Sequence, residues 1–81
     1  MLVPLYGFLR GDSIGLLVLV HDTDAVEEIG RKLQEAAAVR VTPRSAADVY
    51  YRGTLLDPAL SVAQAGLEAL ERVDVVPKEA R

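Results

Sequence analysis

The spacing of hydrophobic residues changes period within the first half of the chain. Residues 14–20 read Ile-Gly-Leu-Leu-Val-Leu-Val, an apolar run that has the length of one strand. After a polar break, Val26, Ile29 and Leu33 follow at offsets of three and four, which places them on one stripe of a helix. Neither element can bury its apolar side alone. We therefore expect the rest of the chain to form a sheet that packs on this helix.

The predicted helix has recognisable ends. Asp24 is expected to be its N-cap, because its carboxylate can accept the unpaired N–H groups of the first turn. Glu27 and Glu28 follow in that turn, where the helix dipole favours acids. Gly30 costs a helix about 1 kcal/mol relative to Ala and so indicates close packing on the sheet. The helix is expected to end near Ala38.

Alternating residues and turn residues predict the remaining elements. In the first and last expected strands, the side chains at alternate positions point to opposite faces, and Gly and Pro mark the turns between elements. Ser61 is expected to cap a short helical turn that ends at Gly66. The expected elements are strands over residues 3–8, 48–52 and 72–76, a short extended stretch over 55–56, a helical turn over 61–65 and a frayed tail over 77–81.

This order of elements predicts a single α+β domain over residues 1–81, with one main helix packed on a mixed sheet of four to five strands. The order resembles that of the β-grasp, or ubiquitin-like, fold, and segments 24–33, 51–56 and 60–67 carry the resemblance. Strand parity also predicts the core. The helix residues Val26, Ile29 and Leu33 should face Leu16, Val18, Val49, Tyr51, Val73 and Val75.

Composition excludes several classes of protein. A net charge of −3 argues against a nucleic-acid binder, which needs a basic face. No apolar run reaches the roughly 18 residues of a membrane span. The chain has no cysteine, so disulfides and thiolate metal sites are excluded. Its first residues do not read as a signal peptide. We therefore expect a cytoplasmic protein with a compact core.

Candidate chemistry is sparse. The single histidine, His21, stands beside Asp22 and Asp24, a set that could bind a metal weakly but is more often a solvated loop. No second histidine completes a site, and no serine has the context of a nucleophile. We expect no catalytic, cofactor or metal residue on this chain, and no small-molecule ligand.

The predicted sheet leaves one face without an obvious cover. Leu17 and Leu19 have the parity that points away from the helix, and an apolar centre with a charged rim is typical of a protein interface. The alternative is that the loop over residues 39–47 folds back and buries both leucines. The arginines near the third strand are either solvated or bind an acidic partner. The predicted interface comprises Tyr6, Leu17, Leu19, Arg40, Arg44, Tyr50, Arg52 and Val76.

Short motifs along almost the whole chain suggest a family. They are Val3-Pro4, Phe8, Asp12 and segments 17–20, 40–44, 65–67 and 73–76. In order and spacing they resemble the small B, or gamma, subunit of toluene-4-monooxygenase-type hydroxylases. The resemblance implies a non-catalytic, ubiquitin-like accessory subunit that binds the alpha and beta subunits of the hydroxylase. It also implies that the di-iron centre lies on the alpha subunit, and that electrons come from NADH through a reductase and a Rieske ferredoxin.

The chain departs from that family in two places. Its third strand is less basic than expected, and it ends in Pro-Lys-Glu-Ala-Arg instead of an acidic tail. These departures leave open a free-standing ubiquitin-like adaptor, such as those of type VII secretion. A conjugated modifier or a sulfur carrier is less favoured, because both need a C-terminal Gly-Gly.

Overall fold

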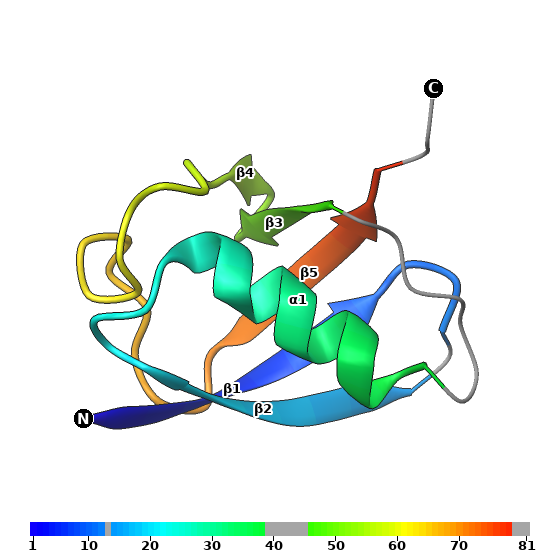
Figure 1. Ribbon diagram of the computed structural model, residues 1–81, viewed down its shortest axis with the longest axis horizontal. Coiled ribbons are helices and arrows are strands. Elements are labelled where there is room, and N and C mark those ends of the chain that lie inside the picture. The colour runs from blue at the N-terminus through cyan, green and yellow to red at the C-terminus, as the bar shows by residue number, and fades with distance from the viewer. Residues whose placement is uncertain (13, 39–45, 79–81) are drawn as a thin grey trace.

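The computed structural model describes residues 1–12, 14–38 and 46–78. In this part of the chain, one helix crosses one face of a five-stranded sheet (Figure 1). The elements in chain order are β1 (Leu2–Leu9), β2 (Gly15–His21), α1 (Val26–Ala36), β3 (Ala47–Tyr51), β4 (Thr54–Leu55) and β5 (Arg72–Pro77).

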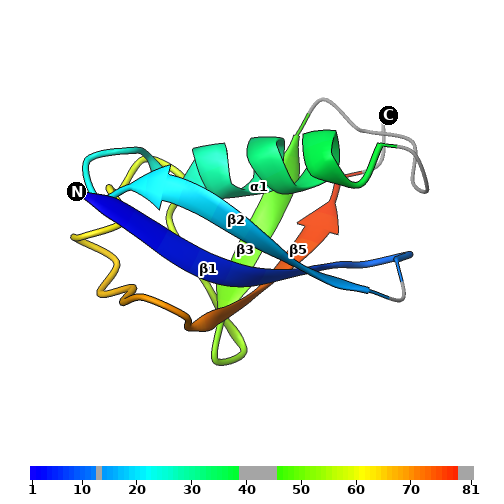
Figure 2. The ribbon, with the colours of Figure 1, turned by 90° about the horizontal axis from the view of Figure 1, so that it is seen from below.

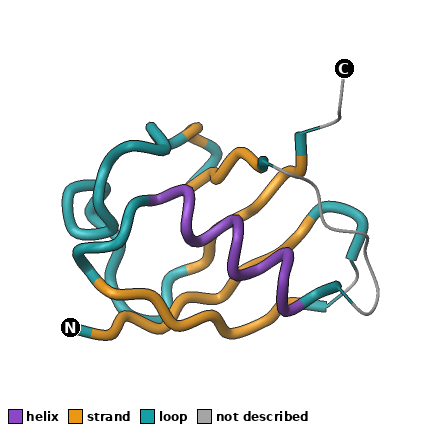
Figure 3. The backbone as a smooth tube through the Cα atoms, in the orientation of Figure 1, coloured by secondary structure: helices purple, strands orange, loops and turns teal. Residues whose placement is uncertain are grey.

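The sheet is mixed, with the strand order β2-β1-β5-β3-β4. The central strands β1 and β5 are parallel, and every other neighbouring pair is antiparallel. Figure 3 shows α1 crossing the strands, and the turned view of Figure 2 shows that it lies in a separate layer. This arrangement confirms the predicted α+β class and the β-grasp topology.

The core lies between α1 and the facing side of the sheet. Ile29 and Leu33 are fully buried, and Leu16 and Tyr51 pack against the core at its margin. Gly7 of β1 is needed beneath the helix, because an added Cβ would lie 2.8 Å from a methyl carbon of Leu33. The core pairing predicted from parity is therefore confirmed, with Val18, Val26, Val49, Val73 and Val75 all buried.

The helix begins differently from the prediction. Its N-cap is Ala25, and no side chain caps it. The carboxylate of Asp24 instead accepts the backbone N–H of His21 at 2.8 Å. Backbone carbonyls satisfy the first N–H groups of α1: Val26 N–H donates to Leu60 and Glu27 N–H to Pro58. The assignment of Asp24 as N-cap is wrong, because a segment distant in sequence supplies the acceptors.

Residues 62–66 form consecutive turns after Ser61, which bridges to Ala25, in place of the short helix expected over 61–65. The predicted cap still exists as a reciprocal pair, since Ser61 Oγ accepts Gln64 N–H and Ser61 N–H donates to Gln64 Oε1. Gly66 has a φ of +77°, which suits the end of this segment. Hydrogen bonds from Val62 N–H to Asp24 and from Val26 N–H to Leu60 fix these turns against the start of α1.

The last strand is longer than expected. β5 includes Pro77, and Lys78 N–H donates to the carbonyl of Ala46 at 3.0 Å. Residues 79–81 of the predicted tail lie outside the described residues.

Candidate partner interface

The sheet face opposite α1, here called the outer face, exposes large apolar side chains. In Figure 2, α1 lies on one side of the sheet, and the described residues place no helix on the other side. Leu17 is 54% exposed, Leu19 51% and Tyr6 46%. In the β1–β2 register, Tyr6 pairs with Leu17 and Pro4 with Leu19. The structure therefore brings these three predicted residues together.

Two residues that we did not predict extend this group. Leu2 is 55% exposed and shares the parity of Tyr6, and Pro4 lies between them on β1. Leu2 precedes the strand expected over residues 3–8, and Pro4 lies within that strand but was not assigned to the interface. We define the docking patch as Leu2, Pro4, Tyr6, Leu17 and Leu19. A contiguous exposed apolar patch of this kind is typical of a protein interaction site.

Leu70 adjoins the docking patch from the loop that precedes β5. It is 58% exposed, and its N–H donates to the carbonyl of Pro4 at 2.6 Å. Leu70 has a φ of +65° and so does not belong to a strand, which is why strand parity could not predict its exposure.

The other half of the outer face is charged. Tyr50 and Val76 lie on this half, and Arg72 and Asp74 of β5 separate them from the docking patch. Arg72 pairs with Asp74 at 3.0 Å and also stacks over the ring of Phe8. These contacts neutralise the charges within the sheet. The predicted interface is therefore split into an apolar half and a mixed half.

Of the three arginines predicted to rim the interface, only Arg52 lies among the described residues. Arg52 is in the turn between β3 and β4, where it stacks over the Tyr51 ring and pairs with Glu71 at 3.6 Å. The carbonyl of Glu71 accepts the N–H of Tyr6 at 3.0 Å, so Glu71 links Arg52 to the Tyr6 end of the docking patch. Arg40 and Arg44 lie outside the described residues, as does most of the loop expected over 39–47.

A hydrogen-bonded group holds the loop that carries Leu70. Tyr51 Oη donates to Glu71 Oε1 at 2.5 Å, and Glu68 N–H donates to the other oxygen of Glu71 at 3.0 Å. The bond from Tyr51 holds the pKa of Glu71 below its usual value, and the nearby carboxylate raises the pKa of Tyr51. The group therefore favours an ionised Glu71 and a neutral Tyr51.

Glu71→Gln should weaken the acid sensitivity of the fold. Because the folded-state pKa of Glu71 is below its ordinary 4.5, its stabilisation is present above that pH and is lost as pH falls through the folded-state pKa. Urea unfolding near about pH 6 and about pH 3 would measure the difference for wild type and variant. Glu27→Gln, an exposed glutamate on α1, is the matched control. An equal loss in all three proteins would contradict the assignment.

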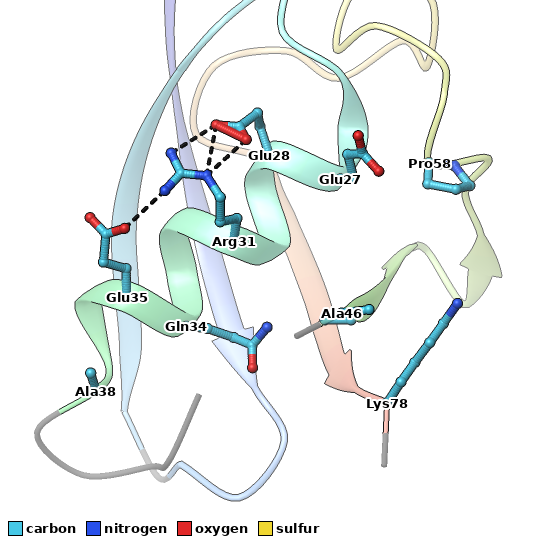
Figure 4. Close-up of a pocket in the computed structure, with 10 residues that line it drawn as sticks. Glu27, Glu28, Arg31, Gln34, Glu35, Ala38, Ala46, Pro58 and Lys78 are labelled. Atoms are coloured by element: carbon cyan, nitrogen blue, oxygen red, sulfur yellow. Dashed lines mark hydrogen bonds and ion pairs between the residues drawn. The ribbon is translucent and has the colours of Figure 1, made fainter. Parts of the chain in front are cut away.

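A groove of about 550 Å³ runs between α1 and the start of β3 (Figure 4). Arg31 in this groove donates to Glu28 at 2.8 Å and to Glu35 at 2.9 Å, and these contacts raise its pKa. Lys78 on the other side pairs with Asp48 at 3.3 Å. Both cations are therefore engaged by carboxylates of the chain itself, and the described residues that line the groove bring no reactive groups together.

The histidine and its two aspartates are each engaged separately. The amine of Met1 binds Asp22 at 3.0 Å and lowers its pKa, whereas Asp24 accepts the His21 N–H. Within residues 1–12, 14–38 and 46–78, no three His, Asp or Glu side chains gather as a metal site would require. The same residues contain no helix that is long and apolar enough to cross a membrane.

Solved structures define the class. One chain of the toluene 4-monooxygenase HD complex with the inhibitor 4-bromobenzoate matches with a TM-score of 0.86 and 24% sequence identity. The match covers 96% of this chain and 100% of that chain. Caldiarchaeum subterraneum ubiquitin matches at 0.75 with 12% identity over 99% of this chain and 98% of its own. The ubiquitin-like domain of Plasmodium falciparum Dsk2 matches at 0.74 with 14% identity over 96% and 100%. The chain is a ubiquitin-like β-grasp protein.

Residues 2–76 match the model of one family, toluene-4-monooxygenase system protein B. The chain belongs to that family, and so to the small accessory components of multicomponent monooxygenases. No curated protein matches it. Of the two partner classes considered from the sequence, the family supports the oxygenase and not a free-standing adaptor.

Proposed function

We propose that this chain is the B, or gamma, subunit of a di-iron monooxygenase that hydroxylates aromatic hydrocarbons, and that its docking patch binds the hydroxylase. The observation that carries the proposal is the contiguous apolar surface on β1 and β2, where Tyr6 pairs with Leu17 and Pro4 with Leu19. An accessory subunit contributes by binding, and this face has the composition of an interface core.

In this proposal the chemistry takes place on other chains. The alpha subunit would hold the di-iron centre, and the hydroxylase alpha and beta subunits are the proposed partners. Electrons would come from NADH through a reductase and a ferredoxin, so the complex would work in the cytoplasm. This chain would supply no iron ligand, no other cofactor site and no substrate pocket.

Purification of the tagged chain from its native host tests this proposal. We expect the large hydroxylase subunits to co-purify with the chain and iron to follow them, whereas the desalted chain alone should hold no stoichiometric iron. His21→Ala is the control for adventitious metal, because its imidazole is exposed. Recovery without any oxygenase subunit would overturn the proposed partner. Stoichiometric iron in the isolated wild type that disappears in His21→Ala would overturn the proposed location of the metal.

A further inference from the structure

The two edges of the sheet are built differently. The edge strand β4 is only two residues long, and Pro58 follows shortly after it. The opposite edge, β2, is seven residues long and pairs with β1 in an uninterrupted register from Gly15 to His21. Folded proteins protect long edge strands with charges, prolines or bulges, because an open edge recruits other strands. β2 has no proline and no bulge, and only His21 at its end is polar.

The open backbone groups of β2 can be assigned from its hydrogen bonds. Asp22 N–H donates to Met1, and antiparallel ladders alternate, so Val18 and Leu16 direct their N–H groups to β1. The N–H groups of Leu17 and Leu19 then point away from the sheet. Two contacts agree with this alternation, since His21 N–H binds Asp24 and the carbonyl of Leu19 accepts Lys32 Nζ.

Lys32 marks one end of this open ladder. Its ammonium lies 3.0 Å from the carbonyl of Leu19, and no carboxylate among the described residues pairs with it. The side chain is half-buried between α1 and β2. An ammonium at this position favours a carboxylate on whatever covers the edge. Because Leu17 and Leu19 also belong to the docking patch, the open edge and that patch are continuous.

We propose that the partner adds a strand to β2. The occupant is an extended segment of the hydroxylase that hydrogen-bonds to Leu17 and Leu19. Its apolar side chains at alternate positions extend the outer face beside Leu17 and Leu19, and it carries a carboxylate near Lys32. This inference rests on the proposed function. When a strand is added to a sheet edge, main-chain hydrogen bonds give affinity and alternate side chains give specificity. The open N–H groups of β2 supply the hydrogen bonds, and Leu17, Leu19 and Lys32 supply the side-chain contacts.

Amide hydrogen exchange tests the geometry directly. The ¹⁵N-labelled chain, alone and bound to the hydroxylase, is exposed to D₂O, quenched and examined residue by residue. Free Leu17 and Leu19 amides should exchange quickly and slow at least about tenfold in the complex. The amides of Leu16 and Val18 are internal controls and should be protected in both states. A complex that forms without protection of Leu17 and Leu19 overturns strand addition but leaves the proposed function standing. Absence of any complex overturns the proposed function itself.

A pair of variants separates the backbone from the side chain. Leu17→Pro and Leu17→Ala both remove the leucine side chain, but only the proline variant also removes the outward N–H. An edge strand tolerates proline at a position whose N–H points away from the sheet. Leu17→Pro should bind the hydroxylase roughly tenfold more weakly than Leu17→Ala, because a partner carbonyl loses its donor. Equal affinities of the two folded variants would overturn the proposal. If circular dichroism shows that Leu17→Pro is unfolded, the exchange measurement on the wild-type chain decides.

Discussion

Leu33→Ala is expected to lower the free energy of unfolding by about 2 to 5 kcal/mol. Leu33 is fully buried, and its methyl groups lie directly against the backbone of Gly7. Removal of the side chain loses its burial and leaves a cavity between α1 and β1. A domain of this size has a total stability of only about 4 to 12 kcal/mol, so the variant should approach the limit of folding.

Leu17→Ala is the matched control, because the same atoms are removed from a side chain that is half exposed. Its cost should stay below about 1 kcal/mol. Urea titrations of both variants followed by circular dichroism give the comparison. A loss below about 1 kcal/mol for Leu33→Ala would mean that the helix does not pack on β1 as described.

Leu19→Asp is expected to leave the chain folded and to weaken its association with the hydroxylase at least about thirtyfold. The substitution places a carboxylate at the centre of the docking patch, and a charge buried there without a partner is costly. Tyr50→Ala, on the charged half of the outer face, should have a much smaller effect. Affinities can be measured by titration of immobilised hydroxylase with each variant.

The pair of variants also locates the interface. Unchanged binding by folded Leu19→Asp would move it away from β1 and β2, and a larger loss from Tyr50→Ala would move it to the β5–β3 half. Unfolding of Leu19→Asp would show that this side chain is buried within the domain.

Most of the fold prediction rested on strand parity, that is, on which side chains of each strand share a face. A strand has only two faces, so each assignment of Val18, Val49 or Val73 to the core also fixed which neighbours point outwards. The same reasoning found Leu17, Leu19 and Tyr6 on the open face. It succeeds here because one helix covers one side of the sheet, which makes every strand two-sided.

Distant contacts account for the features that could not be predicted. Asp24 is a residue type that commonly caps helices, but the carbonyls of Pro58 and Leu60 accept the first N–H groups of α1 instead. Local sequence cannot reveal a hydrogen bond between segments more than 30 residues apart. The sequence likewise gives no partner for Arg52, but in the structure it stacks over the Tyr51 ring and pairs with Glu71. The division of the outer face into two halves depends on strand order, which places β5 between β1 and β3.

The central pair of strands has a consequence for how the chain is made. β1 and β5 are the first and last strands in the sequence, yet they lie side by side in the middle of the sheet. During synthesis, the amino-terminal hairpin and α1 emerge from the ribosome long before the strand that joins them to β3. Until β5 emerges, two separate pieces of sheet have unpaired edges. Folding must therefore wait for nearly the whole chain, and the loop closure that joins its two ends is expected to limit the rate.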